Sequence, residues 1–565
     1  MYAGQIEAVK LPDTGKTHIL GNGYVYWYNE ARWDNDRKMT VDNRVAIGKL
    51  DPDHPGMMFP NKRYFSLFKD APIKESPSAL PEDILQAPGC FSRNLNYGPY
   101  LAMMYAADHA GALKTLKQVF PKIWRKILAV AIHSADAENS VAQDFPYWCF
   151  QNYCGLSKPL TSGEISILYE EIAADTQSIP NFMYYFKDEY HKAFPENGET
   201  VLAFDSTNQN TYSKNNPKAE YGHPKVNEKL PDINTALFVD ETTGIPLYYE
   251  HFYGSLLDKS ETPYTVEKAQ DLGFRKFFLM MDRGYFSQAV LCSMEGLSFG
   301  IMCPDNLLIV RQMIHDYGEA IRDHEDYYIA QEDVYGIHRA NVPLSGGCYD
   351  VYLFYDSRRA EDERGTVHQK VKTLIQMAES RKHFSKKMQG QFSPWLVIEP
   401  SEKDPGSGRC FSVKENRKSV QDCLDEAGFF VIVSNAGLDA EQMIRIARMR
   451  DQGEKAFHRM KSHFGLAKTY VHNAVTYEGK MFVAFFSLIM VEAYRHYVKE
   501  VLTATASETT ATTIGELRKY QIHQKRDGSW MPAYAMTKKQ KQIFRKLQLT
   551  EKEVEKTARE LKLRV

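Results

Sequence analysis

Net charge and cysteine are both scarce in this chain of 565 residues. Lys and Arg number 70 and Asp and Glu 72, which leaves a formal net charge of −2 at pH 7. A net charge this close to zero gives the chain no overall attraction to a polyanion. Binding to nucleic acid would therefore depend on local basic patches. The 8 cysteines show no zinc-ligand spacing, which favours free thiols in a reducing compartment over a metal site or a disulfide framework.

Long hydrophobic runs are missing as well. The most apolar stretch, residues 481–491, lies between Lys480 and Glu492, and it is too short to span a bilayer. We therefore expect a buried core helix there and no membrane partner. The N-terminus lacks the apolar core of a signal peptide, so we expect a cytoplasmic protein. With 43% hydrophobic and 25% charged residues, the composition is that of a globular protein with several domains.

Positive charge gathers in two stretches. Residues 441–470 contain seven Lys and Arg against three acids, and residues 511–565 contain fourteen against six. Local patches of this kind contact phosphates. The second stretch is equally compatible with DNA binding, with contact to a second protomer, or with a solubilising surface.

The first basic stretch lies on a helix predicted from about residue 439 to 464. Side chains four and seven positions apart share one face of a helix. Arg450, Glu454 and Lys461 therefore form a stripe with one carboxylate between two cations. His458 falls on the same stripe, where a packed or solvated role is favoured. A solvated ladder of ion pairs would give the same pattern.

Two further acids stand where buried strands are predicted to end. Apolar runs close on Asp205 and on Asp282, and polar residues or glycine follow each of them. Such runs suit the centre of a sheet, and catalytic groups gather at the carboxyl ends of sheet strands. With Glu454 on a packed helix, the three acids would form a cage of oxygen ligands that suits Mg²⁺ or Mn²⁺.

These motifs together resemble bacterial insertion-sequence transposases of the DDE class. The spacing Arg450-x3-Glu454-x6-Lys461 is similar to the R-x3-E-x6-K part of that family's Y-x2-R-x3-E-x6-K signature, with Ala447 at the tyrosine position. The resemblance covers about residues 200 to 495. Any one motif alone would be weak, and it is their combination that is specific.

The order of the motifs supports this resemblance. The segments 205–207 and 282–285 look like the family's two aspartate motifs, in the right order. The strand that closes on Asn435 resembles the one that the family places just before its glutamate helix.

The resemblance implies that the protein is an enzyme, a DDE transposase. Asp205, Asp282 and Glu454 would be both the catalytic residues and the ligands of two Mg²⁺ or Mn²⁺ ions, with Asp205 shared between the ions. The reaction would be strand cleavage at the element ends and then strand transfer into target DNA. Water attacks first and the freed 3′ hydroxyl attacks later, so the protein supplies no nucleophile.

The resemblance also implies contacts with double-stranded DNA, both the terminal repeats and the target. Arg450 and Lys461 would hold phosphates. Arg283 would add a contact or form an ion pair at a helix start. In related transposases an inserted β-domain stacks on a displaced base, a role for which Trp395 is a candidate, although a tryptophan in a strand is more often part of a core. We expect a homodimer or higher oligomer that acts at the bacterial nucleoid.

The predicted fold class is α/β with a ribonuclease-H-like core. We expect strands at 200–206, 235–240 and 245–252, a helix at 264–272, a strand at 276–281, a helix at 286–296 and a strand at 298–303. Asp282 and Glu454 are 172 positions apart, too far for a plain connection. This predicts a core formed by residues 199–304 and 428–495, interrupted by a β-rich insertion at 305–427.

Three other regions complete the expected organisation. Residues 1–75 are predicted to form a β-rich module that touches DNA or packs on its neighbour. Residues 98–195 are predicted to form a helical domain whose basic face binds duplex DNA or is simply solvated. Residues 496–565 are predicted to be helical and basic.

Two other functions compete with this interpretation. A catalytically silent DNA-binding protein descended from a transposase would show the same motifs. A glycosidase also uses paired carboxylates, but that function would not explain why Arg450 and Lys461 flank Glu454.

Overall fold

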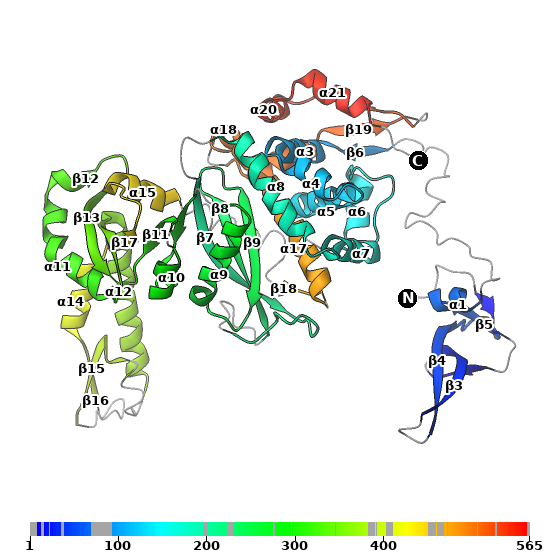
Figure 1. Cartoon of the computed structure of the whole chain (residues 1–565), viewed down its shortest axis with the longest axis horizontal. Coiled ribbons are helices and arrows are strands. Elements are labelled where there is room, and N and C mark those ends of the chain that lie inside the picture. Colours follow the sequence, from blue (N-terminus) through cyan, green and yellow to red (C-terminus); the bar gives the residue numbers. More distant parts are fainter. Residues whose placement is uncertain are drawn as a thin grey trace. The chain divides into compact units, whose positions relative to one another are not determined.

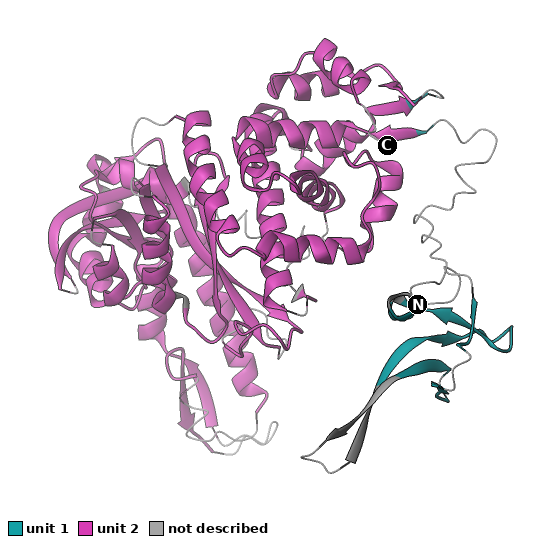
Figure 2. Cartoon of the chain, turned by 45° about the vertical axis from the view of Figure 1, so that its right-hand side comes forward, with its two compact units in different colours: residues 1–93, 524–527 teal, residues 94–523, 528–565 magenta. Residues whose placement is uncertain are grey.

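The computed structural model divides the chain into two compact units (Figure 2). Residues 1–93 and 524–527 form the first unit, and residues 94–523 and 528–565 form the second. The structure describes residues 8–12, 16–21, 23–34, 39–68, 93–138, 141–195, 200–222, 230–274, 277–294, 296–344, 346–381, 390, 392–402, 411–449, 459, 468–471, 473–505, 507–525 and 528–561.

The first unit is a small antiparallel sheet with one helix. Its strand order is β1-β5-β4-β3-β2. The strands and helix are β1 (Val9–Lys10), β2 (Thr17–Ile19), β3 (Tyr24–Asp34), β4 (Met39–Leu50), β5 (Met57–Pro60) and α1 (Lys62–Leu67). Strands β3 and β4 lie in the region predicted to be β-rich, and residues 35–38 between them lie outside the described residues. Val25, Ile47 and Met58 form the core of this unit.

The second unit begins with short strand β6 (Asn94–Asn96) and a group of helices (Figure 1). Pro121 stands between the second and third of them, where the sequence predicts a helix boundary. The helices are α3 (Gly98–His109), α4 (Ala112–Val119), α5 (Trp124–Ala137), α6 (Phe145–Gln151), α7 (Ser162–Ala173) and α8 (Ser178–Ala193).

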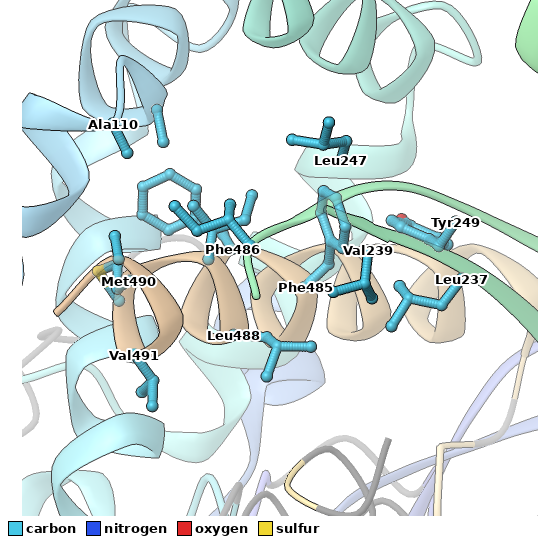
Figure 3. Close-up of a cluster of buried hydrophobic side chains, with 14 of the residues drawn as sticks. Ala110, Leu237, Val239, Leu247, Tyr249, Phe485, Phe486, Leu488, Met490 and Val491 are labelled. Atoms are coloured by element: carbon cyan, nitrogen blue, oxygen red, sulfur yellow. The ribbon is translucent and has the colours of Figure 1, made fainter. Parts of the chain in front are cut away.

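Helix α17 (Ala474–Tyr497) is the centre of this helical part, and it packs on α3, α5, α7 and strand β9 (Pro246–Tyr253). It is longer than the apolar run that marks it in the sequence, and by length and composition alone it is apolar enough to cross a membrane. Its most apolar window is 78% buried inside the protein. Figure 3 shows Phe485 and Phe486 of α17 among side chains from the helices and the sheet. The predicted buried core helix is therefore found.

The sheet of the second unit is built on seven elements in the predicted order. They are β7 (Thr200–Thr211), β8 (Asp232–Asp240), β9, α9 (Asp258–Asp271), β10 (Phe277–Met281), α10 (Gln288–Ser293) and β11 (Ser298–Met302). Strand β7 pairs antiparallel with β8, and β8 pairs antiparallel with β9. On its other side β7 pairs parallel with β10, and β10 pairs parallel with β11.

The stretch expected as an insertion divides in two. Its elements are α11 (Leu308–Asp323), β12 (Tyr328–Ile329), β13 (Val334–Leu344), β14 (Gly347–Tyr355), α12 (Ser357–Glu379), β15 (Leu396–Pro400), β16 (Phe411–Glu415) and α14 (Arg417–Glu426). Strands β12, β13 and β14 extend the main sheet. Strand β17 (Phe429–Ser434) joins them to it, because it pairs antiparallel with β11 on one side and with β14 on the other. Only β15 and β16 form a sheet of their own, which α12 and α14 accompany.

The main sheet is buried on both faces. Side chains alternate between the two faces of a strand, and those of β10 enter two different cores. From β10, Phe277, Leu279 and Met281 join the large core that contains α17. Phe278 and Met280 join a second core with side chains of α15 (Ala440–Met449). Helices α17 and α15 therefore serve opposite faces of the sheet.

The C-terminal region packs against the helical part. Strand β19 (Gln521–Gln524) pairs antiparallel with β6 and also neighbours β20 (Trp530–Pro532). Four short helices accompany them: α18 (Lys499–Leu502), α19 (Thr510–Arg518), α20 (Lys538–Lys546) and α21 (Glu551–Arg559).

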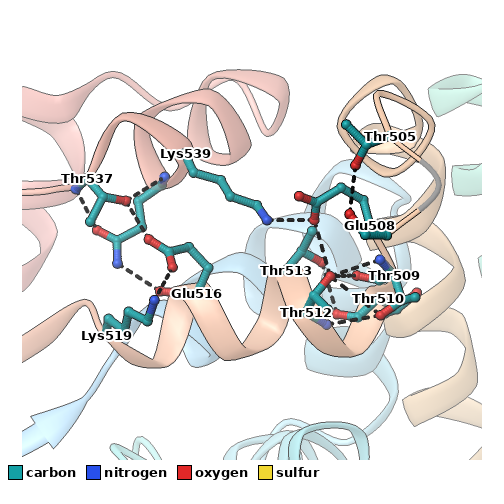
Figure 4. A network of polar contacts seen from close by, with 12 residues as sticks. Thr505, Glu508, Thr509, Thr510, Thr512, Thr513, Glu516, Lys519, Thr537 and Lys539 are labelled. Carbon is teal, nitrogen blue, oxygen red and sulfur yellow. Dashed lines mark hydrogen bonds and ion pairs between the residues drawn. The ribbon is translucent and has the colours of Figure 1, made fainter.

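Much of the positive charge in this region is neutralised within the protein. Lys539 lies 2.5 Å from Glu508, and Lys519 lies 2.6 Å from Glu516 (Figure 4). On α20, Lys541 pairs with Glu551 of α21 at 2.9 Å. The excess of basic residues in the sequence therefore overstates the charge available to a phosphate.

Stability should depend on pH through a histidine of α5. His133 is buried between Phe145 and Trp148, and burial lowers its pKa to about 4. The unfolded chain binds this proton below about pH 6.5 and the folded protein does not, so stability falls from there down to about pH 4. We expect His133→Phe to remove about 2 kcal/mol of the loss between pH 7 and pH 5. Urea unfolding of both proteins at pH 7 and pH 5 measures this loss. An equal loss in free energy of unfolding for the two proteins would contradict the prediction.

Candidate active site

The two predicted aspartates lie side by side on neighbouring strands. Asp282 follows the last residue of β10, as predicted, whereas Asp205 lies within β7, which continues to Thr211 and does not end at 206 as the sequence suggests. In the parallel pairing of β7 with β10, Phe204 is in register with Met281. The residues that follow are Asp205 and Asp282. Because paired strands are about 4.8 Å apart, this register brings the two backbones within one strand spacing at the level of the carboxylates.

Both carboxylates belong to the face of the sheet that α15 covers. Asp282 keeps an extended backbone, with φ −79° and ψ 165°. It therefore continues the alternation of β10 toward the face that Phe278 and Met280 occupy. On β7, Val201 packs on the second core, so alternation along the strand places Asp205 on the same face.

A tyrosine connects the second aspartate segment to the first aspartate. Asp282 caps the short 3₁₀ turn η1 (Arg283–Tyr285), where its Oδ1 accepts the backbone N–H of Arg283 at 2.7 Å. The hydroxyl of Tyr285 at the end of this turn donates to Oδ1 of Asp205 at 3.1 Å. Its buried ring packs on Phe204 with 5.0 Å between ring centroids. The sequence places Tyr285 in the second aspartate motif, but only the fold shows that it contacts the first aspartate.

Arg283 forms an ion pair next to this site. Its Nη1 lies 2.9 Å from Oδ2 of Asp305, and both side chains are more than half exposed, at 55% and 60%. An exposed pair of this kind is worth at most about 1 kcal/mol, so it would yield readily to a phosphate. The predicted DNA contact of Arg283 stays a prediction.

The third predicted acid, Glu454, lies outside the described residues, as do Arg450, His458 and Lys461 of the same stripe. The described residues on either side bracket that stretch. Helix α15 ends at Met449 on the face that both aspartates share. Strand β18 (Lys468–Thr469) then pairs parallel with β7 at Asn210 and Thr211, beyond the level at which β10 ends. The described neighbours of this stretch are therefore a helix on the face that the aspartates share and a strand that pairs with β7 beyond Asp205.

Three basic residues of the first basic stretch are held by acids of the protein itself. On α15, Arg445 lies 2.7 Å from Glu441. Arg448 lies 3.3 Å from Glu332 and 3.2 Å from Asp356. Arg459 also pairs with a carboxylate, on α17. The count of basic residues in the sequence thus misses how many of them are already neutralised.

The signature position with alanine and the strand end before it also have structural roles. Ala447 is half-buried against the core under α15. Asn435, directly after β17, accepts the backbone N–H of Phe299 at 3.0 Å and donates to the carbonyl of Leu297 at 2.7 Å. It thereby fixes the start of β11.

Trp395 lies immediately before β15 and is half-buried. Its ring packs on the small core around Val371 and Leu396. The ammonium group of Lys370 lies 4.3 Å from the ring centroid. Trp395 thus packs on a core, although it lies just outside the strand in which the sequence placed it. The predicted stacking on a displaced base stays a prediction.

The donor set suits a hard divalent cation. Two carboxylates are already adjacent, and carboxylate oxygens are the ligands that Mg²⁺ and Mn²⁺ prefer. Among the residues that the structure describes, no group of three or more His, Cys, Asp or Glu is placed to hold a metal ion. Glu454, the remaining predicted ligand, is not among those residues.

Comparison with known proteins assigns the family. Residues 196–490, more than half of the chain, match the family described as Transposase DDE domain. The chain belongs to this transposase family. The match includes Asp205, Asp282 and Glu454 together with the whole stretch between them. A DDE-class transposase is thus confirmed, and polynucleotidyl transfer is the activity that this family implies.

Two solved transposase structures are similar to the chain only at low scores. A cryo-EM structure of the piggyBac transposase synaptic complex with hairpin DNA shares 8% identity, covers 75% of this chain and 79% of that chain, and has a TM-score of 0.33. The Mos1 transposase paired-end complex with left transposon end shares 14% identity, covers 45% of this chain and 73% of that chain, and has a TM-score of 0.14. No curated protein matches the chain.

The role of Tyr285 can be tested in this transposase. Tyr285→Phe keeps the ring on Phe204 but removes the hydroxyl that holds Asp205. Because a hydrogen bond to a charged group is worth about 1.5–3 kcal/mol, we expect DNA strand cleavage to slow at least about tenfold with the melting temperature nearly unchanged.

Tyr248→Phe is the matched control for this variant, since it removes a hydroxyl that donates to Glu250 at 2.9 Å on β9. It should cleave at the wild-type rate. Equal rates for Tyr285→Phe and wild type would show that Asp205 needs no such support.

Proposed function

We propose that this transposase cleaves DNA at the ends of its element and joins the freed ends to target DNA, with Asp205, Asp282 and Glu454 as its catalytic acids. The observation that carries the proposal is the register of β7 with β10, which places the first two acids next to each other. The third acid, Glu454, lies in the chain between α15 and β18 and is outside the described residues.

We further propose that the core is ribonuclease-H-like. Five adjacent strands in the order β9-β8-β7-β10-β11 support this, with antiparallel pairing up to β7 and parallel pairing from β7 onward. Strand β7, at the centre of the five, carries the first aspartate.

The three carboxylates would hold two Mg²⁺ or Mn²⁺ ions. Ions bound there would activate the attacking oxygen and stabilise the leaving 3′ oxygen. Asp205 would be the shared ligand, held in place by Tyr285. Arg450 and Lys461 would neutralise phosphates beside the scissile bond. The attacking groups are water and then the 3′ hydroxyl of the DNA, so the residues of the chain bind, orient and neutralise.

The partner would be double-stranded DNA, both the terminal repeats and the target. Two ends must be brought together for transfer, so a dimer or larger assembly would be needed. The signature spacing around Glu454 favours an origin in a bacterial insertion sequence, with the protein acting in the cytoplasm at the nucleoid. Arg283 and Trp395 would supply further DNA contacts.

Removing any of the three acids should abolish cleavage. We expect Asp205→Ala, Asp282→Ala and Glu454→Gln to lower the cleavage rate by at least about a thousandfold, since each would remove a metal ligand. DNA binding should remain largely intact. The assay is incubation with Mg²⁺ or Mn²⁺ and a linear duplex that carries the DNA flanking the gene.

The control for this series is Glu441→Gln. Glu441 is an exposed acid of α15 that pairs with Arg445, so its loss should leave cleavage unchanged. A variant of one of the three acids that still cuts would remove that residue from the catalytic set.

Two cations of the signature should govern the electrostatic part of DNA binding. Arg450→Ala and Lys461→Ala should each weaken binding and reduce the slope of log affinity against log salt by about one. Arg445→Ala is the matched control, because Arg445 is already paired with Glu441. Unchanged binding in all three variants would show that Arg450 and Lys461 only form surface ion pairs and do not contact DNA.

A catalytically silent DNA-binding protein is the alternative. The adjacency of Asp205 and Asp282 argues against it, because a silent protein has no need to keep two acids next to each other on neighbouring strands. Tight binding to the terminal repeats, with no metal-dependent breaks in the wild-type assay, would favour the alternative.

A further inference from the structure

The small sheet of the first unit has a core side and an open side. Helix α1 packs on β4 and β5, and its Tyr64 joins Val25, Ile47 and Met58 in the core of the unit. Because side chains alternate along a strand, the residues between these core positions belong to the opposite side of the sheet, here called the open face. Among the described elements of the unit, α1 is the helix that packs on the sheet, and it does so on the core side.

Three tyrosines form a row on the open face. Tyr24, Tyr26 and Tyr28 occupy alternate positions of β3, and the residues between them, Val25 and Trp27, pack on the core side. Tyr24 is 36% exposed, and the other two tyrosines are half-buried. Since each residue of a strand advances the chain by about 3.4 Å, successive tyrosines of the row are attached about 6.8 Å apart.

Two cations of β4 lie beside this row. Lys49 is the cross-strand partner of Tyr24, and Arg44 is the partner of Tyr28. Nζ of Lys49 and Cζ of Arg44 each lie 5.7 Å from the ring centroid of the tyrosine opposite. Both side chains are exposed, so the open face presents positive charge and aromatic rings together.

Two exposed lysines extend the positive charge to the outer strands. Lys16 precedes β2, and its carbonyl accepts the backbone N–H of Tyr28 at 2.9 Å. Lys10 ends β1 opposite Met57, the neighbour of the core residue Met58. Where the side chains of this sheet are described, the open face contains no acidic residue.

The charge of these cations is not cancelled by the described acids of the unit. The ion pair that the described residues of this unit form joins His54 to Asp51, in the segment that follows β4. The arginines of α15, by contrast, are held by acids of the protein itself. A positive surface without neutralising acids attracts a polyanion.

The tyrosine row favours an unpaired strand over a duplex. Bases stacked in a duplex are about 3.4 Å apart along the strand, which is half the spacing of the row, and each base face is covered by its neighbour. Unpaired bases can spread apart and stack on aromatic side chains. A sheet face with aromatic rings and flanking cations is a surface of the kind that binds single strands.

We propose that the open face of the first unit binds single-stranded DNA, with the three tyrosines stacking on bases and Arg44 and Lys49 neutralising phosphates. This inference rests on the proposed function, in which DNA is the partner, and it adds a DNA site outside the catalytic core. A strand that loses its pairing at a cleaved end would be such a ligand.

The test measures how tightly the full-length protein binds oligothymidine of about 20 nucleotides, which exceeds the usual site size, and a duplex of the same length. The buffer contains no divalent metal. We expect Tyr24→Ser/Tyr28→Ser to weaken binding to the single strand at least about twentyfold, because two stacked bases are lost. Affinity for the duplex should change less than about twofold in this variant, since paired bases cannot reach the rings.

A second variant tests the charge and serves if the serine variant does not fold. Arg44→Gln/Lys49→Gln should weaken binding to the single strand and lower the slope of log affinity against log salt by about 0.7 for each cation. An oligothymidine with one 5-iodouracil base should crosslink, on irradiation, to the peptide that contains Tyr24, Tyr26 and Tyr28.

Arg63→Gln is the matched control. Arg63 is an exposed cation of the same unit, but it lies on α1, the helix of the core side. This variant should bind the single strand as the wild type does.

Four results would overturn the inference: no binding of oligothymidine by the wild type, wild-type affinity in both the serine and the glutamine variants, an equal loss in Arg63→Gln, or crosslinks that all lie outside the first unit. A loss of duplex binding as large as the loss of single-strand binding would overturn the assignment to an unpaired strand. Because the binding assay scores no breaks, it decides the inference even for a protein that fails the cleavage assay of the proposed function.

Discussion

The pairing of β7 with β10 is the constraint on which the rest of the site depends. Parallel strands cannot be joined by a tight turn, so the chain passes through β8, β9 and α9 before β10 returns to β7. The register of that return sets the distance between Asp205 and Asp282. Tyr285 then connects the turn after β10 to Asp205 within β7, so a hydrogen bond joins the two aspartate segments.

The elements of the core could be predicted from the sequence because their signals are local. The run Phe277–Met281 is apolar at every position, and the structure buries its side chains alternately in the two cores. Asp205 and Asp282 were identifiable because each interrupts an apolar run. The strand stops before Asp282, whereas β7 continues past Asp205 as a polar run to Thr211, which the sequence did not indicate. Strands β12 to β14 were not recognisable as part of the main sheet, because their pairing depends on β17, far along the chain.

Charge was the property that the sequence described least well. A count of basic residues treats Arg448 as available to DNA, whereas Asp356, 92 positions away, pairs with it. The same holds for Arg459 and Glu492, 33 positions apart. Which cations remain unpaired on the surface is therefore a property of the fold, and Arg459 of the stretch with Glu454 has a structural role.

Strand β19 has a consequence for how the protein is made. Gln521 hydrogen-bonds to Asn96 across 425 positions of sequence, so the sheet that borders the first helices stays incomplete until nearly the whole chain has left the ribosome. Contacts of such separation are entropically expensive to close and form late. A chain cut short before β19 would leave the edge of β6 unpaired and would lack α20 and α21, whose Ile543, Phe544 and Val554 belong to the large core. Such truncated products would be targets for aggregation and proteolysis.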